Sequence, residues 1–167
     1  MDSAEPLSLV LEFGRVESTS DPYAFHFKPQ DYFLRHGHGG LDTAHFLWTP
    51  ELLRDLEAVR LPGRDAATVQ RLGDTLRQFL KTTGWVTSEA QILDAVQARR
   101  PVTLTVRSAA AELYALPWEL MTLQPTGQHL GELPALLLQY AWPEIEELPA
   151  PALEHAENGR ILFAWSA

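Results

Sequence analysis

The sequence predicts an α/β domain in which amphipathic helices pack on a mixed sheet that starts with an N-terminal β-hairpin or meander. Segments with the two-residue alternation of strands occur near both ends of the chain. Segments with the 3.6-residue period of helices lie between them. The 167 residues, of which 46% are apolar, are also enough to bury one core.

The N-terminal strands are predicted from alternation. Leucine and phenylalanine at the odd positions of residues 7–13 alternate with less apolar residues at the even positions, and Gly14 follows. Aromatic residues at positions 23, 25 and 27 alternate with His26 and Lys28. Residues 23–27 are therefore predicted to return as the second strand of an antiparallel hairpin. Residues 44–48 are predicted to form a third strand.

Three amphipathic helices are predicted after these strands. Thr49-Pro50-Glu51 combines a capping hydroxyl, a proline suited to the first helical position and an acid at the positive end of the helix dipole. A second helix carries an apolar stripe that reaches Leu80, and a third begins at Thr87. Because each apolar stripe is narrow, the helices are expected on the surface of the core.

The C-terminal half is predicted to return to strands. Residues 102–106 alternate as a strand does, and a short helical turn begins at Trp118. Residues 136–142 are apolar on both faces, which predicts a strand in the centre of a sheet. Residues 144–159 are acidic and proline-rich and predict an exposed linker. Residues 160–165 have the composition of a buried strand.

These segments predict three parts of the chain: a domain over residues 1–143, a linker over 144–159, and the first strand of a truncated second domain over 160–167. An apolar strand after a linker needs neighbours on both of its edges. We therefore expect that the rest of the second domain is missing, and that the chain self-associates through this last strand.

Charge and composition exclude several classes of function. There are 13 lysines and arginines against 22 acidic residues, a net charge of −9, which disfavours binding to nucleic acids and to anionic membranes. There is no cysteine, which removes disulfides, thiolate metal sites and a cysteine nucleophile from this chain. The sequence shows neither a signal peptide nor a long apolar run, so the expected compartment is the cytoplasm.

A histidine cluster is the first candidate for chemistry. His36 and His38 flank Gly37, and Asp42 or His45 would complete a metal site. The His-Gly pair is also similar to the catalytic His-Gly of caspase-like proteases, but the chain offers it no cysteine. A solvated glycine-rich turn is the favoured interpretation, and no metal or cofactor is assigned.

Two further groups of residues are expected to have structural roles. A run of glutamates would offer carboxylates for acid–base chemistry, but a solvated linker does not split their pKa values. These are Glu144, Glu146, Glu147, Glu154 and Glu157. Five tryptophans make an aromatic cage conceivable, but each lies among leucines at the boundary of an element, so core packing is expected. They are Trp48, Trp85, Trp118, Trp142 and Trp165.

One segment supports a family resemblance. The motif Leu116-Pro117-Trp118-Glu119-Leu120 follows a predicted strand, and Leu130-Gly131 then leads into the apolar strand that ends near Tyr140. A proline-rich linker separates this strand from the segment GRILFAWS at residues 159–166. In these features and their order the sequence resembles the CHAT domain family, caspase-like cysteine proteases of bacteria.

The resemblance implies that residues 1–143 form a degenerate caspase-like (pseudo-caspase) subdomain, non-catalytic, which scaffolds and regulates a protease half. In that family the catalytic histidine and cysteine lie on later strands, so no catalytic residue of this chain is assigned. The implied partners are the missing C-terminal protease half and sensor or repeat-containing regulatory proteins. A free-standing interaction domain without enzymatic activity is the alternative, and a metal-binding module built on His36, His38 and His45 is a third reading.

Overall fold

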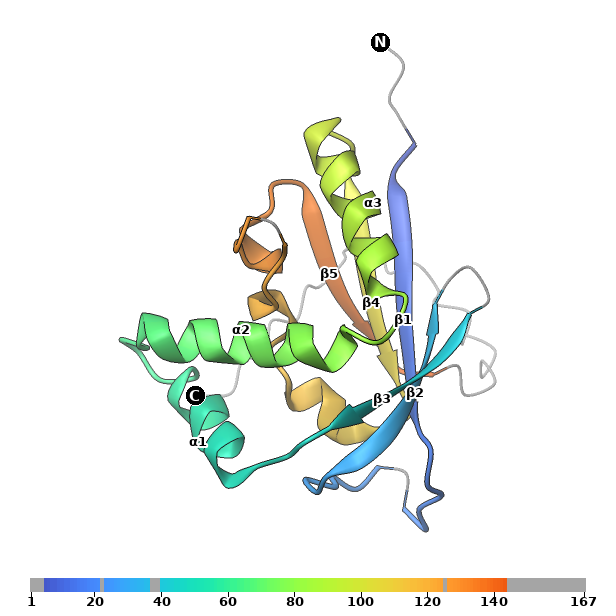
Figure 1. Ribbon diagram of the computed structural model, residues 1–167, viewed down its shortest axis with the longest axis vertical. Helices are drawn as coiled ribbons and strands as arrows, with labels where there is room; N and C mark the ends of the chain where they lie inside the picture. Colours follow the sequence, from blue (N-terminus) through green and yellow to red (C-terminus); the bar gives the residue numbers. More distant parts are fainter. Residues whose placement is uncertain (1–4, 22, 37–39, 125, 144–167) are drawn as a thin grey trace, which may run out of the picture.

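The computed structural model describes residues 5–21, 23–36, 40–124 and 126–143, and within them the predicted α/β fold is confirmed (Figure 1). Five strands form one mixed sheet in the order β3-β2-β1-β4-β5. The strands are β1 (Leu7–Arg15), β2 (Gln30–His36), β3 (Leu41–Phe46), β4 (Val102–Ser108) and β5 (Leu136–Ala141). The α-helices are α1 (Pro50–Ala58), α2 (Ala66–Leu80) and α3 (Trp85–Gln97). Short 3₁₀ turns span Ala111–Ala115, Trp118–Leu120 and Leu130–Glu132.

The sheet has an antiparallel half and a parallel half that share β1. On one side β1, β2 and β3 form an antiparallel meander, in which Phe13 lies opposite Leu34. On the other side β1, β4 and β5 run parallel, with Leu104 opposite both Leu9 and Leu138. The carboxyl ends of the three parallel strands therefore meet at one edge of the sheet.

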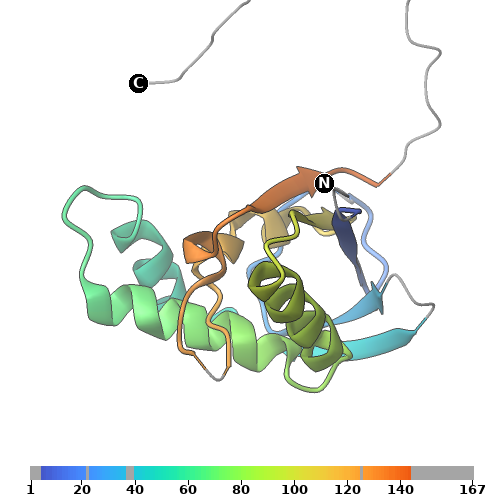
Figure 2. The same cartoon turned by 90° about the horizontal axis from the view of Figure 1, so that it is seen from above.

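Helices cover one face of this sheet. Alternate residues of β1 and β4, such as Leu11 and Leu104, are buried beneath α2 and α3, and the sheet curls around α3 (Figure 2). Thr103, Thr105 and Arg107 have the opposite parity and point to the second face. Among the described residues no helix lies over that second face, and the side chains of β4 that point to it are half-buried.

The predicted start of the first helix is confirmed by its cap, and the second helix has a cap that the sequence analysis does not predict. Thr49 Oγ1 accepts a hydrogen bond from the backbone N–H of Leu52 at 3.1 Å, and a proline occupies the first turn of α1. Asp65 accepts one from the backbone N–H of Thr68 at 3.0 Å, and these backbone hydrogen bonds lower the pKa of Asp65. The third helix begins at Trp85, two residues before the predicted start, because the indole of Trp85 is itself part of the core.

The prediction of a strand at residues 23–27 is wrong. This segment is irregular, and β2 begins only at Gln30. Side chains, not a neighbouring strand, bind its backbone: Asp21 accepts from the N–H of Tyr23 at 2.9 Å, and Arg15 donates to the carbonyl of Ala24 at 2.8 Å. Because alternation reports only which side chains are apolar, it cannot reveal that the backbone is bound in another way.

The prediction of a central strand at residues 136–142 is also wrong. Among the described strands β5 is the last of the sheet, and Leu137 and Tyr140 are exposed. The predicted third strand at residues 44–48 is shifted as well, since β3 spans Leu41–Phe46. The linker predicted at 144–159 and the strand predicted at 160–167 lie outside the described residues. None of the helices in the described ranges is long and apolar enough to cross a bilayer.

Candidate functional site

The carboxyl edge of the parallel strands is the natural place for a site in this fold. Ligands of open α/β sheets bind where neighbouring strands send their connections to opposite sides. Here β1 ends at Arg15 and continues to β2 on one side, whereas β4 ends at Ser108 and leads to β5 on the other. The crevice between the ends of β1 and β4 is therefore the expected position of a ligand site in this fold.

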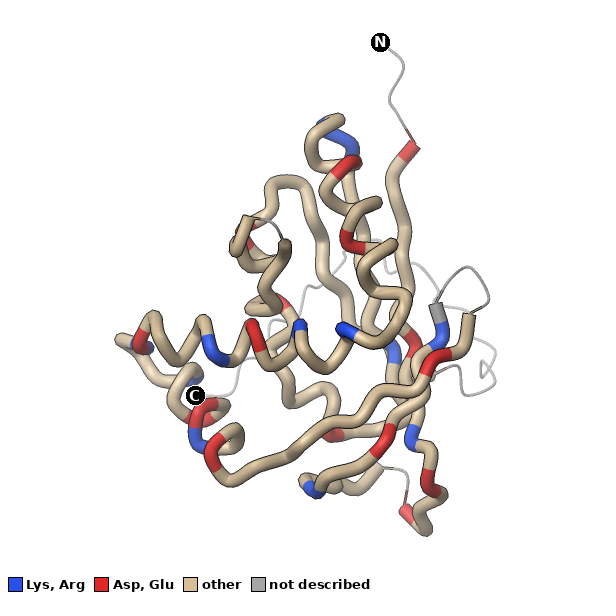
Figure 3. The backbone as a smooth tube through the Cα atoms, in the orientation of Figure 1, with Lys and Arg blue, Asp and Glu red and all other residues tan. Residues whose placement is uncertain are grey.

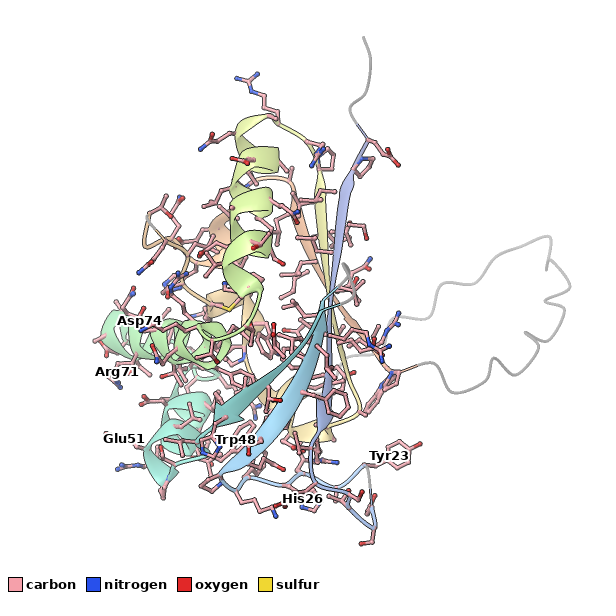
Figure 4. The ribbon with its side chains drawn as sticks, turned by 45° about the vertical axis from the view of Figure 1, so that its right-hand side comes forward. Tyr23, His26, Trp48, Glu51, Arg71 and Asp74 are labelled. Atoms are coloured by element: carbon pink, nitrogen blue, oxygen red, sulfur yellow. The ribbon has the colours of Figure 1, made fainter. Side chains whose placement is uncertain are left out.

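A buried carboxylate fills this crevice. Glu112, on the first 3₁₀ turn after β4, is fully buried and accepts hydrogen bonds from several side chains. The donors are Arg15 Nε at 3.0 Å and Nη2, Gln30 Nε2 at 3.1 Å and the Tyr32 hydroxyl at 2.8 Å. The N–H of His26 also donates to it, at 3.4 Å. His26 and Trp48 lie at this same end of the sheet (Figure 4).

The electrostatics of this cluster are those of a structural ion pair. Burial opposes ionisation of Glu112, but the hydrogen bonds from Arg15 and Tyr32 outweigh it and hold the pKa of Glu112 below its ordinary value. Burial and the adjacent carboxylate raise the pKa of Tyr32 far above its ordinary range. Glu112 is thus ionised with its oxygens occupied, and it anchors the loop between β1 and β2 instead of offering a base to a substrate.

A second buried ion pair ties the helices together. Glu89 of α3 is buried and pairs with Arg77 of α2, whose Nη2 lies 3.2 Å from Oε2 of Glu89. Glu89 Oε1 also accepts from the backbone N–H of Gln124 at 2.8 Å, and Arg77 donates to the carbonyl of Thr122 at 3.4 Å. The pair therefore fixes the segment after the Trp118 turn against both helices. Figure 3 shows charges of both signs interspersed along α2.

The Leu116–Leu120 motif is built into the core. Trp118 is fully buried, and its Nε1 donates to the carbonyl of Leu113 at 2.9 Å. Its ring stacks on Phe13 at a centroid distance of 5.3 Å and contacts Phe79 at 6.3 Å. Glu119 is exposed and accepts a hydrogen bond from the hydroxyl of Tyr140 at 3.3 Å. The motif thus joins β1, α2 and β5.

A cleft of about 330 Å³ lies between this motif and α1. Arg60 and Arg64 line it from the α1 side, and Glu119 and Tyr140 line it from the other. Among the described residues that line it there is no serine, threonine or histidine that could act as a nucleophile or base. The cleft is suited to holding a polar group and not to the chemistry of acyl transfer.

Beside the cleft, three exposed aromatic rings and the half-buried ring of Tyr114 gather at the end of β5. We name Tyr23, Tyr114, Tyr140 and Trp142 the outer aromatic cluster. Tyr114 contacts Trp142 at 4.8 Å and Tyr140 at 6.2 Å, and Tyr23 meets Trp142 at 6.3 Å. Trp142 is 57% exposed and Tyr140 is 47% exposed. Tyr23 projects outward from its loop (Figure 4).

This cluster corrects one prediction about the tryptophans. Trp48, Trp85 and Trp118 are buried, as expected for core residues. Trp142 is exposed, so the prediction of core packing is wrong for it, because β5 is an edge strand with no neighbour beyond it in the described sheet. Trp165 lies outside the described residues.

Of the candidate metal ligands, the structure describes the side chains of Asp42 and His45. Asp42 and His45 are three apart on β3, so they point to opposite faces of the sheet. Asp42 accepts from the backbone N–H of Gly84 at 2.8 Å, and His45 Nδ1 pairs with Asp31 Oδ1 at 2.6 Å. The described residues hold no group of three or more histidine and acidic side chains able to bind a metal ion. His38 and the glutamates from Glu144 onward lie outside the described residues.

Neither the Glu112 cluster nor the outer aromatic cluster is predicted from the sequence. Arg15 and Glu112 are 97 positions apart, and no local pattern connects them. The sequence shows the aromatic residues Tyr140 and Trp142, but whether their rings are exposed depends on the order of the strands. Comparison with models of protein families gave no match, and neither did comparison with curated proteins or with solved structures.

Proposed function

We propose that this chain is the N-terminal, non-catalytic region of a caspase-like cysteine endopeptidase of the CHAT type, acting in the cytoplasm, where it scaffolds and regulates a protease half. The observation that carries the proposal is the one-sided cover of the parallel strands. All-parallel sheets almost always have both faces covered, and three of the five described strands of this mixed sheet run parallel. In the described residues β1, β4 and β5 carry helices on one face only. A second domain on the other face would supply the missing cover.

The edge strand supports the same proposal. β5 presents exposed Leu137 and Tyr140, and the outer edge of its backbone has no neighbour among the described strands. An apolar edge of this kind is a template for pairing with another polypeptide. A protease half, or a sensor or repeat-containing protein, would use this surface.

The chemistry of the buried charges also favours scaffolding. Glu112 and Glu89 are both engaged in ion pairs that connect separate segments of the chain. The sequence contains no cysteine, so the thiol nucleophile of the proposed endopeptidase would come from another segment of polypeptide. The role left to this chain is to position that segment.

The test extends the chain by the polypeptide encoded in frame after residue 167 and measures peptide cleavage. We expect a histidine and a cysteine on later strands, cleavage by the extended protein, loss of cleavage when that cysteine becomes alanine, and none from residues 1–167 alone. A reading frame without such residues contradicts the proposal and favours a free-standing interaction domain. So does cleavage that survives replacement of the cysteine.

A further inference from the structure

We infer that the outer aromatic cluster is a binding site for an organic ammonium group, such as the side chain of a methylated lysine or a choline. Tyr114, Tyr140 and Trp142, together with Ala141, line a pocket of about 290 Å³. Aromatic faces attract cations through the ring quadrupole, and several rings around one space form the usual cage for a quaternary ammonium.

The rings that line this pocket are inclined to one another. The planes of Tyr114 and Trp142 meet at 48°, and those of Tyr114 and Tyr140 at 57°. Tyr23 approaches Trp142 at 61° and extends the aromatic wall beyond the pocket. Rings that packed only to fill a core would be buried, as Trp118 is, whereas Trp142 and Tyr140 leave about half of their surface to solvent.

Two walls of the pocket are fixed by hydrogen bonds. The Tyr114 hydroxyl accepts from the backbone N–H of Ser108 at 2.7 Å, and it lies within donating distance of the carbonyls of Ser108 and Ala141. The Tyr140 hydroxyl donates to Glu119. A ligand therefore meets rings that are already ordered, which lowers the entropy cost of binding.

Charges of both signs flank the pocket, and the carboxylate of Glu119 is the one that is hydrogen-bonded to a ring of the pocket. The chain carries a net charge of −9, and the Glu119 carboxylate accepts a hydrogen bond from Tyr140, one of the residues that line the pocket. Burial and the proximity of Glu119 raise the pKa of Tyr140, so its ring remains a neutral phenol. Arg107 lies close enough to Tyr114 to act electrostatically on its hydroxyl, and Arg60 and Arg64 line the neighbouring cleft, but none of the three lines the pocket itself.

The experiment uses residues 1–167 and follows the methyl protons of tetramethylammonium and of choline by NMR. Contact with ring faces moves these signals upfield. The tert-butyl isostere of choline, in which carbon replaces nitrogen, tests whether charge is required. We expect saturable upfield shifts for the ammonium probes and at least about tenfold weaker binding of the neutral isostere, a difference of about 1.4 kcal/mol.

Matched variants locate the site. Trp142→Ala should weaken binding at least about tenfold. Leu137→Ala, an exposed change on the same strand, should change it less than about threefold. Equal binding of the neutral isostere, or unchanged binding by Trp142→Ala, would overturn the inference. Binding of a proline-rich peptide at this pocket, together with no binding of the ammonium probes, would also overturn the inference. Comparing choline with a trimethyllysine amide then shows which source of the ammonium group binds better.

Discussion

Two aromatic groups flank the segment that follows β4, and they differ in what they do. The inner aromatic cluster, Phe13, Phe79 and Trp118, is buried, and its rings lie 5.3 to 6.3 Å apart beneath the helices. The outer aromatic cluster has similar spacings, but its rings leave faces open to solvent. The difference arises from position in the sheet. The inner rings lie between the helices and the central strands, whereas the outer rings lie at the edge strand β5. Residue type alone therefore does not separate a core from a binding surface.

The largest difference between the clusters should appear in stability. Trp118→Ala empties a fully buried site and should lower the free energy of unfolding by about 3–5 kcal/mol. Trp142→Ala removes an exposed ring and should change it by less than about 0.5 kcal/mol. Denaturant titration of the two variants measures both values. Equal losses would show that the outer cluster also builds the fold.

The stability of the fold should be nearly as sensitive to loss of the buried ion pair between Arg15 and Glu112. Glu112→Gln removes the buried carboxylate charge that pairs with Arg15 and should cost about 3–5 kcal/mol of unfolding free energy. Glu119→Gln is the control at the outer cluster. Because Glu119 is exposed and receives one long hydrogen bond, that change should stay below about 1 kcal/mol. A small loss for Glu112→Gln in the same titration would mean that the pair does not anchor the loop after β1.

The pH dependence of stability follows from the same carboxylate. The pKa of Glu112 is lowered in the folded chain from an ordinary value of 4.5, so ionised Glu112 stabilises the fold. Its contribution is fully present above the ordinary value and is lost as the pH falls through the lowered, folded value. Unfolding measured between neutral and acidic pH should show this loss in the wild type. In Glu112→Gln the profile should be flatter, and an identical profile would contradict the assignment.

A smaller effect is expected where α2 meets the motif that separates the two clusters. A Cβ at Gly73 would lie 2.3 Å from the carbonyl oxygen of Leu120 and 2.8 Å from Cγ2 of Thr122. Gly73→Ala should therefore destabilise the fold by about 1–3 kcal/mol, although alanine favours helices. At Gly40 nothing lies within 4 Å of such an atom, so Gly40→Ala is the matched control. Thermal unfolding of both variants distinguishes a close contact from a general effect of glycine. A Gly73→Ala variant as stable as the wild type would contradict the close packing.

The sequence was informative wherever structure is local. The cap at Thr49 predicts the start of α1, and the alternation at residues 102–106 predicts β4. Predictions from the sequence were wrong where the structure depends on contacts between distant segments. Residues 23–27 alternate like a strand, but Arg15 and Glu112 bind their backbone, and the second of these lies far along the chain. Residues 136–142 look central because they are apolar, whereas their place at the edge depends on the order of all five strands. The candidate site was missed for the same reason.

The most direct test of the division between the two clusters is fluorine NMR of the chain labelled with fluorotryptophan. The resonance of Trp142, assigned through Trp142→Phe, should shift between light and heavy water and should move when tetramethylammonium is added. The resonance of Trp118 should do neither, because its ring is fully buried. A solvent shift at Trp118, or a Trp142 resonance that responds to neither solvent nor tetramethylammonium, would contradict the separation of an inner structural cluster from an outer binding cluster.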